Sequence, residues 1–244
     1  MRMIIVGLCI AVAGLGIRTI RAGEADGWIL LSEEDFSAWR GKPLEQWKNV
    51  KDVKLDSNNK RKLVPVVGKG TIYNGMKGRA RNLLTRENYG DVELHLEFLM
   101  AERSNAGVKF HGHYEIQILD SYGKKKLTGA DCGGIYPRAV IDKGYRHIDK
   151  GIAPRVNACK KPGEWQTLDV IFLAPRFDTD GKKTTNAKIV KAVLNGKVIH
   201  ENLQLKTPTG HLWVRPEMAV GPIMLQGDHG PVAFRNVKIR KIAK

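Results

Sequence analysis

The stretch from Asp91 to Met100 alternates apolar and polar side chains with a period of two residues. The apolar positions are Val92, Leu94, Leu96 and Phe98, and the polar positions between them are Glu93, His95 and Glu97. Successive side chains of a β-strand point to opposite faces, so the pattern predicts a half-buried antiparallel strand. This part of the chain is therefore expected to lie in a sheet with one covered face.

Further strand patterns follow, and Gly, Pro, Asn and Asp fill the gaps between them. They cover residues 108–111, 113–119, 168–174, 187–194, 197–201 and 232–242. Asn195-Gly196 separates two of these strands and is a strong signal for a type I′ hairpin. Helix signals are few, with one short capped turn expected at residues 32–35. Many short strands separated by turn signals predict an all-β chain. Because the 244 residues contain no repeat and no linker, we predict that they fold as one two-sheet jelly-roll β-sandwich rather than as two small domains.

The N-terminal residues have the layout of a secretory signal peptide. A positive start at Arg2 precedes an apolar run over residues 4–17, and small residues follow at Ala22 and Ala25. We therefore expect residues 1–25 to be a signal peptide and residues 26–244 to be a single exported domain, periplasmic or secreted. Beyond this segment no apolar run is long enough for a spanning helix, so we expect no membrane span after signal removal.

The chain is strongly basic, with a formal net charge of +16. The lysines are scattered and do not interleave with aromatic residues as they do in nucleic-acid-binding motifs, so we expect no nucleic-acid partner. A solvated basic surface is the favoured explanation of the charge. Acidic glycans or an anionic envelope are a weaker alternative.

The strand expected at residues 113–119 gathers polar side chains on one face, namely His113, Glu115 and Gln117. Neighbours on one strand face lie about 6.5–7 Å apart, so these three form a polar cluster that could grip a sugar. An ordinary solvent-facing strand shows the same alternation and is the favoured interpretation of the strand pattern on its own. A retaining glycosidase needs two carboxylates, and this face offers only Glu115. A second acid would have to come from elsewhere, for example Glu97 or Asp228.

A glycine-rich segment at residues 225–230 holds a second polar group, formed by Gln226, Asp228 and His229. Its glycines allow the backbone to turn tightly or to approach a ligand closely. Asp228 and His229 are interpreted as a metal-binding or acid–base pair, or as plain turn residues.

Residues of metal-ligating type also occur close together at His111, His113 and Glu115. The familiar metal-ligand spacings are absent, so we predict no metal site and no cofactor, and we do not favour a divalent cation. Cys132 and Cys159 do not make a zinc site on their own. In an exported protein they are compatible with a disulfide or with two buried thiols.

Several segments resemble the 3-keto-disaccharide hydrolase domain family, long catalogued as a domain of unknown function. They are ILLSEEDFSAW (29–39), LLTRENYGDVELHLEF (83–98), SNAGVKFHGHYEIQILDSYG (104–123), CGGIY (132–136), PGEWQTLDVIFLAPRFD (162–178), LNGKVIHEN (194–202) and GPIMLQGDHGPVAFRNVKIR (221–240). The segments run in family order over nearly the whole exported domain. The resemblance implies a fold similar to that of concanavalin A-type lectins and glucanases, and an activity on keto-glycosides. The chain departs from the family at His111 and His113, where arginine is common.

The keto-glycoside substrate implied by the resemblance suggests a reaction. A ketone at sugar C3 acidifies the hydrogen on C2, so one base can start the elimination of the C1 substituent. We expect Glu115 or a nearby histidine to take the proton, Gln117 and basic neighbours to hold oxygens, and His229 or His113 to protonate the leaving group. Further substrate contacts are expected at Glu97, Asn105, Lys109, His111, Tyr136, Gln226 and Asp228.

Three functional hypotheses follow. The favoured one is an enzyme, a hydrolase or lyase whose partner is a carbohydrate, either a keto-glycoside or a glycan. The second is a carbohydrate-binding module without turnover, since one fold can host lectins as well as enzymes. The third is a basic protein that binds polyanions or the cell envelope.

Overall fold

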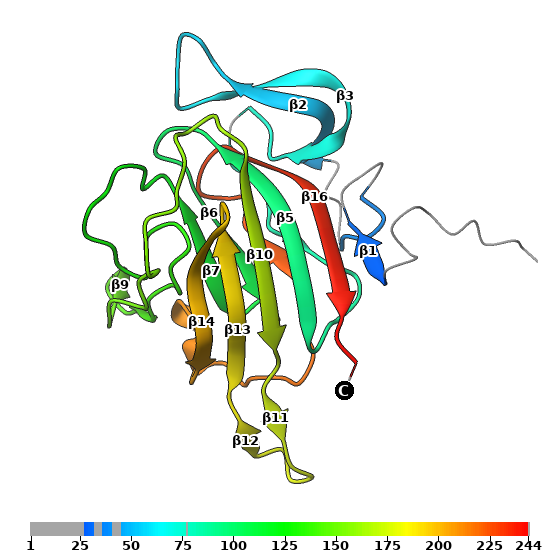
Figure 1. Cartoon of the computed structure of the whole chain (residues 1–244), viewed down its shortest axis with the longest axis vertical. Coiled ribbons are helices and arrows are strands. Elements are labelled where there is room, and N and C mark those ends of the chain that lie inside the picture. Colours follow the sequence, from blue (N-terminus) through cyan, green and yellow to red (C-terminus); the bar gives the residue numbers. More distant parts are fainter. Residues whose placement is uncertain (1–26, 32–35, 41–44, 77, 244) are drawn as a thin grey trace, which may run out of the picture.

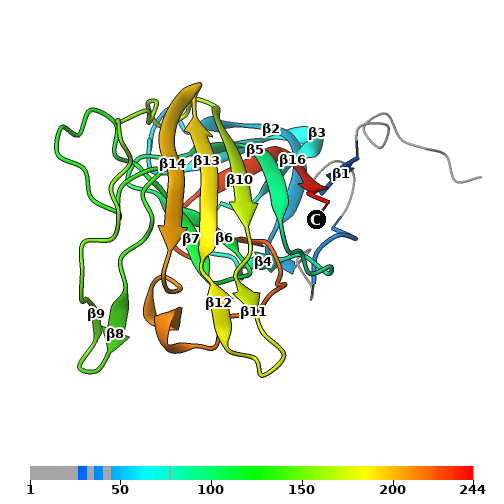
Figure 2. The same cartoon turned by 60° about the horizontal axis from the view of Figure 1, so that its bottom comes forward.

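The computed structural model describes residues 27–31, 36–40, 45–76 and 78–243. The expected signal peptide and the expected turn at residues 32–35 lie outside the described residues. Strands dominate the described chain, in which no helix is long and apolar enough to cross a membrane. The strands form two main antiparallel sheets that pack face to face (Figure 1, Figure 2).

The larger sheet contains eight strands in the described part of the chain, in the order β14-β13-β10-β5-β16-β3-β2, with β1 also paired to β16. Their bounds are β1 Trp28–Leu30, β2 Lys48–Leu55, β3 Leu63–Tyr73, β5 Val92–Met100, β10 Gln166–Leu173, β13 Ala187–Leu194, β14 Lys197–Leu205 and β16 Val232–Lys241. The predicted strand at residues 91–100 is therefore a central strand of this sheet.

The smaller sheet has the order β4-β15-β6-β7. Its strands are β4 Leu83–Leu84, β6 Asn105–Phe110, β7 Tyr114–Leu119 and β15 Met224–Leu225. Beyond β7 the sheet is continued by two bridges, from Ile116 to Ile135 and from Ile135 to Ile152. Two small hairpins, β8 Ala139–Ile141 with β9 Tyr145–His147 and β11 Arg176–Phe177 with β12 Lys183–Thr185, and the short helix η3 His211–Val214 complete the described elements.

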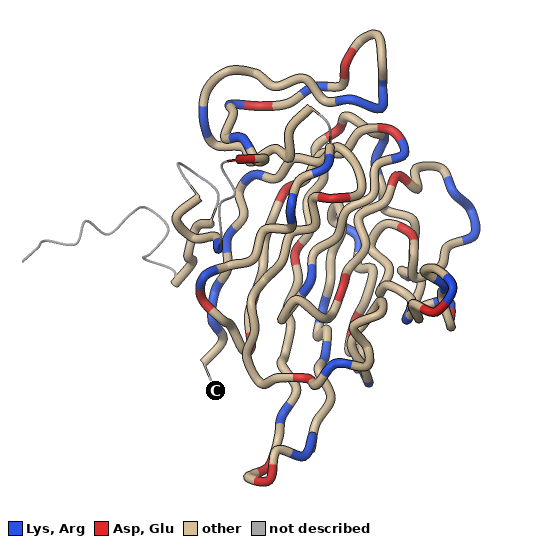
Figure 3. Tube along the Cα trace, turned by 180° about the vertical axis from the view of Figure 1, so that it is seen from behind, with Lys and Arg blue, Asp and Glu red and all other residues tan. Residues whose placement is uncertain are grey.

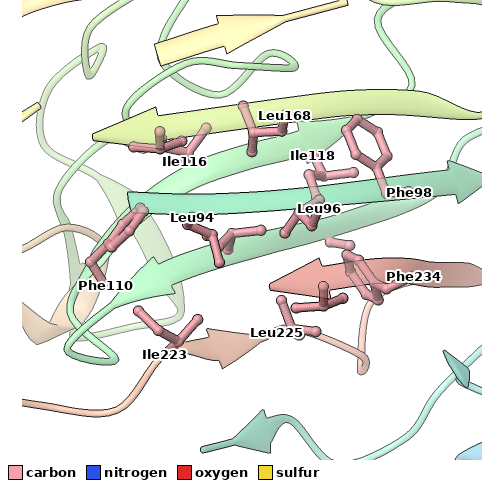
Figure 4. Close-up of a cluster of buried hydrophobic side chains, with 14 of the residues drawn as sticks. Leu94, Leu96, Phe98, Phe110, Ile116, Ile118, Leu168, Ile223, Leu225 and Phe234 are labelled. Carbon is pink, nitrogen blue, oxygen red and sulfur yellow. The ribbon is translucent and has the colours of Figure 1, made fainter. Parts of the chain in front are cut away.

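The main core lies between the two sheets and is built from alternate residues of their strands (Figure 4). From β5 it receives Leu94, Leu96 and Phe98, and from the smaller sheet Phe110, Ile116 and Ile118, all nearly inaccessible to solvent. Each such side chain contributes roughly 1.5–3 kcal/mol when it leaves water. The apolar residues of the alternating pattern are therefore the ones that pack the two sheets together. The predicted two-sheet β-sandwich is confirmed.

The β2–β3 hairpin was not among the expected strands. Its strands carry lysines, a proline and two glycines, and only a minority of their residues are buried, so their alternation is weak. The hairpin covers a second, smaller apolar cluster formed by Val50, Val53, Leu63, Tyr73, Leu99, Ala101 and Ala233. Leu99 and Ala233 alternate with core residues of β5 and β16, so this cluster lies on the face of the larger sheet that is turned away from the main core.

The predicted hairpin at Asn195-Gly196 is confirmed. The two residues have φ values of 51° and 77°, and a type I′ turn requires positive φ at both central positions. The turn joins β13 to β14 with Leu194 opposite Lys197.

A second turn of this kind corrects the expected strands around residues 108–119. His111 and Gly112 have φ values of 56° and 69°, so the chain reverses there. Strand β6 ends at Phe110 and β7 begins at Tyr114. His111 and His113 therefore belong to the turn, and the alternation that was expected to align His113 with Glu115 does not extend to it.

Cys132 and Cys159 are free thiols in the interior. A hydrogen bond from the Cys132 thiol lowers the pKa of Cys159. The same contact, together with burial, raises the pKa of Cys132. The structure thus contains the buried-thiol form of the two alternatives.

Candidate functional site

The outer face of the smaller sheet, the face turned away from the larger sheet, carries a row of neighbouring side chains. Met224 pairs with Lys109, and Lys109 pairs with Glu115 across the ladder. The row continues to Tyr136, whose backbone N–H donates to the carbonyl of Glu115. Because Val108 and the other intervening residues point into the core, this row faces outward.

A buried ion pair lies at the centre of the row. Lys109 Nζ is 2.9 Å from Glu115 Oε2, and the two side chains are only 13% and 3% exposed. Burial raises the pKa of the Glu115 carboxyl, and the charge of Lys109 opposes that rise without cancelling it. A carboxyl of this kind holds a proton at higher pH than a free glutamate does, which suits proton transfer.

Gly107 makes room for the Glu115 carboxyl. A Cβ atom at position 107 would lie 2.4 Å from Glu115 Oε1, far inside van der Waals contact. Gly107 also pairs directly with Gln117 in the sheet. The glycine in the Ser104–Gly107 stretch therefore has a packing reason, which the sequence alone did not reveal.

Asp228 and His229 form a second polar unit, here called the dyad. His229 Nδ1 lies 2.6 Å from Asp228 Oδ1, and their side chains are 51% and 45% exposed. Since a carboxylate only accepts hydrogen bonds, Nδ1 is the protonated nitrogen and Nε2 is left to exchange protons. The charges of both residues act on the pKa of Glu115. The dyad loop also contacts the strand of Lys109, since Gln226 N donates to the carbonyl of Gly107 at 2.9 Å.

Side chains of residues 79–82 and the ring of Trp47 fix the loop that carries the dyad. Gly227 N donates to Asn82 Oδ1 at 3.0 Å, and Arg79 Nη1 donates to the carbonyl of Asp228 at 2.9 Å. Gly227 also sits against the buried ring of Trp47, where an added Cβ would approach the ring to 2.3 Å. The glycine is therefore required for the loop to lie this close to the core.

Aromatic side chains line the other side of Glu115. Tyr136 OH is 3.0 Å from His147 Nε2, and the ring of Tyr145 lies 5.8 Å from that of His147 and 6.1 Å from that of His211. Burial raises the pKa of both tyrosines, and the negative charge of Glu115 contributes in each case. Tyr145 remains half exposed, so its ring is accessible to a sugar.

Residues 27–240 match the 3-keto-alpha-glucoside-1,2-lyase-like domain, a match over most of the chain. The chain belongs to this family. The family expected from the sequence is thereby confirmed. No curated protein matches the chain.

Solved structures agree with this membership. A provisionally assigned glycosyl hydrolase from Parabacteroides distasonis superposes with a TM-score of 0.64 and 27% identity, over 88% of this chain and 84% of its own. A second from the same organism has a TM-score of 0.55 and 21% identity, over 88% of this chain and 99% of its own. A third has a TM-score of 0.56 and 17% identity, over 92% and 98% respectively, so these two show the fold alone. Family and relatives together make the chain a carbohydrate-active protein.

Several residues expected to act in this family member do lie together on the outer face. Glu115 is bound by Lys109 through its side chain and by Tyr136 through the backbone, and the charges of the dyad act on its pKa. Gln226 approaches the dyad, with Nε2 3.2 Å from His229 Nδ1, and its Oε1 is buried without a partner in the described chain. Asn105 begins β6, two residues before Gly107, on the same face.

Gln117 shares the face with Glu115 but is 2% exposed. Its backbone N–H and carbonyl bond to Gly134 and Gly133, and its Oε1 accepts from the N–H of Ile118. The Gln117 side chain is therefore buried beside Glu115, with its Oε1 held by the sheet backbone.

Three expected residues lie elsewhere. His111 is 2% exposed and packs edge-on against Phe172 at 5.2 Å, so it faces the core between the sheets, and burial lowers its pKa. Glu97 lies on the larger sheet, where Arg235 Nη2 binds it at 2.7 Å. His113 sits in the turn, half-buried, and burial lowers its pKa. The charges of Glu217, Lys109 and Arg215 act on its pKa, and its carbonyl accepts from Thr209 Oγ1 in the turn that precedes β7.

Tyr145, His147 and His211 were missed from the sequence. They come from the β8–β9 hairpin and from η3, two surface elements with no periodic pattern. The path of residues 137–147 brings His147 to Tyr136, and η3 brings His211 to Tyr145. Among the described residues no group of three or more His, Cys, Asp or Glu side chains could hold a metal ion.

Proposed function

We propose that this protein cleaves the glycosidic bond of 3-keto-glycosides by removing the C2 proton and eliminating the C1 substituent. The observation that carries the proposal is the buried Lys109–Glu115 pair beside the Asp228–His229 dyad. Together they supply a base, a fixed cation and an exchangeable proton, the three groups that such an elimination needs. The family membership supports the substrate class.

In the first step the Glu115 carboxylate takes the proton from C2. The electron pair of the C2–H bond moves toward C3, and the ketone oxygen becomes the oxyanion of an enediolate. As Glu115 gains the proton it loses its charge, so the Lys109 ammonium is released to pair with the new oxyanion. The negative charge moves from carboxylate to substrate while the cation stays in place, which keeps reorganisation small.

In the second step the C3 carbonyl re-forms, a double bond forms between C1 and C2, and the bond from C1 to the leaving oxygen breaks. Protonated His229 donates the Nε2 proton to that oxygen. Asp228 stabilises the imidazolium before the transfer and keeps Nδ1 protonated after it. Addition of water across the double bond then completes a net hydrolysis, and release before hydration gives a lyase product.

The geometry supports an ordinary two-carboxylate glycosidase less well. The second carboxylate near Glu115 is Asp228, whose Oδ1 is bound to His229. Glu97, the other expected acid, lies on the larger sheet and is bound by Arg235. Neither carboxylate is therefore available as the second catalytic acid that a retaining glycosidase needs beside Glu115.

We further propose that the protein is exported and acts in the periplasm or outside the cell. The support is the pattern of residues 1–25 described above. Cell fractionation of the tagged full-length chain, with N-terminal sequencing of the product, tests this directly. An uncleaved chain in the cytoplasmic fraction would contradict it.

The reaction is tested with the mature protein and a 3-keto-glucoside that carries a chromogenic leaving group, beside the unoxidised glucoside. We expect release from the keto substrate alone, with a transient ultraviolet absorbance of the conjugated enone. Deuterium at C2 should slow the release several-fold, because the C2–H bond breaks in the first step.

The outcomes separate the alternatives. Equal release from both glucosides, or no isotope effect in single-turnover measurements, would contradict the elimination. Sugar binding without release would favour a binding module, in which Tyr145 and Tyr136 serve as the contact surface.

A further inference from the structure

A basic cleft lies beyond the dyad, at the end of the molecule covered by the β2–β3 hairpin. It encloses about 760 Å³ and is lined by four cationic side chains, those of Arg61, Lys62, Arg79 and Arg103. Glu102 is the one acidic residue of its described lining. Figure 3 shows basic positions at the tip of the hairpin and on the loops beneath it.

The backbone fixes these positions while leaving the side-chain charges unpaired. Arg61 N donates to Asn59 Oδ1, and Arg103 N donates to Asp120 Oδ2 from a residue with φ of 57°. Glu102 N donates to the carbonyl of Lys60, which ties the two loops together. Within the described chain, none of the four cationic side chains forms an ion pair, and all are exposed.

Arg79 joins the cleft to the candidate active site. Its guanidinium lines the cleft and donates to the carbonyl of Asp228. A neighbouring pocket of about 420 Å³ shares Arg79 and Asp228 and adds Arg81 and Asn82 to the lining. A chain of sugar rings bound at Glu115 could therefore continue past the dyad into the cleft.

We propose that the basic cleft binds the anionic groups of an acidic glycan, so that the substrate is a keto-glycoside carrying carboxylates or sulfates on its further rings. Four like charges in one cleft repel one another, and an anionic ligand relieves that repulsion. Planar guanidinium groups suit bidentate contact with carboxylate and sulfate oxygens. The described lining contains no aromatic ring, so it lacks the stacking surface that a single-stranded nucleic acid would need.

This proposal rests on the proposed function, because that function locates the reacting sugar ring at Glu115. Binding of an anionic glycan to the cleft can nevertheless be measured without any turnover. Isothermal titration with tetragalacturonate, a sulfated carrageenan tetrasaccharide and uncharged cellotetraose compares carboxylate, sulfate and neutral chains of equal length. We expect at least one anionic chain to bind tenfold or more tightly than the neutral chain. Its affinity should fall steeply between low and moderate salt, because exposed charges are screened beyond about 10 Å at 0.1 M.

The double substitution R61A/K62A is expected to weaken anionic binding about tenfold, the combined effect of two exposed ion pairs. The matched control is K191A/K197A, which removes the same charge from exposed positions at the opposite edge of the larger sheet. The control should change the affinity less than twofold. Thermal denaturation of both variants verifies that they fold.

Equal affinity for the anionic and neutral chains would overturn the assignment. So would equal losses in the two double variants, which would show attraction to the net charge alone. Turnover of a small uncharged 3-keto-glucoside reports separately on the proposed function. Anionic binding at the cleft without such turnover would support the cleft and contradict the proposed chemistry.

Discussion

Two glutamate–cation pairs lie on the outer faces of the two sheets, and their environments shift the carboxyl pKa in opposite directions. Glu115 pairs with Lys109, at 3% and 13% exposure, and burial raises the pKa of Glu115. Glu97 pairs with Arg235, at 17% and 32% exposure. Burial also acts on Glu97, but hydrogen bonds from Asn236 and Arg235 outweigh it and lower the pKa.

The difference shows that an opposite charge does not by itself decide how acidic a carboxylate is. A lysine offers one compact charge, whereas the arginine and the amide together satisfy several lone pairs of the carboxylate. Glu97 is held as a stable anion, which suits a structural role. Burial makes Glu115 a weaker acid than an ordinary glutamate, which suits proton transfer.

The largest contrast is expected in turnover. Glu115→Gln removes the proposed base and should lower kcat/KM for the keto-glucoside about a hundredfold or more. Glu97→Gln removes an ion-paired carboxylate of the same chemistry from the other sheet and should change kcat/KM less than about threefold. Steady-state kinetics with both variants measures this. Comparable losses, or full activity of the Glu115 variant, would rule out Glu115 as the base.

A change in the pH profile is the next effect in size. Glu115 must be ionised to act, so kcat/KM should rise with pH through its raised pKa. Lys109→Met removes the charge that opposes the rise, and should move the acidic limb to higher pH by about one pH unit or more. Arg235→Met removes the cation beside Glu97 and should leave the pH profile of kcat/KM unchanged. An unmoved limb in the Lys109 variant would mean that another group titrates there.

A steric contrast should appear in the free energy of unfolding. Gly107→Ala places a methyl group 2.4 Å from Glu115 Oε1, and should lower the stability by about 1–3 kcal/mol in urea denaturation. The backbone at Gly107 is not in the left-handed region, so the clash is the expected cause. In a Glu115→Ala background the clash is absent and the cost should largely disappear. An equal cost in both backgrounds would contradict the packing explanation.

The smallest effect is in the pH dependence of stability, and its sign differs between the two sites. The raised pKa of Glu115 favours the folded state at low pH, and that contribution is lost as pH rises through the folded pKa. The lowered pKa of Glu97 favours the folded state above the unfolded pKa, and that contribution is lost as pH falls through the folded pKa.

Denaturation of the two Glu→Gln variants at several pH values measures this. Relative to the unsubstituted protein, the Glu115 variant should gain stability as pH rises above about 4.3, an ordinary glutamate value. The Glu97 variant should lose relative stability as pH rises toward that value from below, because the contribution of the ionised Glu97 carboxylate develops there. Parallel curves for both variants would mean that the two carboxyls do not differ as described.

The strands of the main core were predictable because their alternation is the packing pattern itself. β5 and β13 match the expected ranges within one residue, and the Asn195 turn follows from local backbone chemistry. The β2–β3 hairpin was not predictable in this way, since it covers only a small cluster and buries a minority of its residues.

The residues of the candidate site were likewise predictable only where the local sequence shows a pattern. Glu115 and the dyad were found because each lies within a short polar pattern, and the sheet brings the two patterns together. Tyr145 and His211 were not found, because their contacts depend on the path of surface loops. His113 was assigned to the wrong element because two consecutive positive φ values end the alternation just before it.

The close contact between Gly227 and Trp47 has a spectroscopic consequence. The indole ring lies beneath the dyad loop, and its Nε1–H donates to the carbonyl of Arg81, which also lines the neighbouring pocket. Indole emission responds to small changes in the packing and polarity around the ring. Trp47 is therefore a native fluorophore for occupancy of the dyad, and its contribution is isolated by subtracting the emission of a Trp47→Phe variant from that of the whole protein.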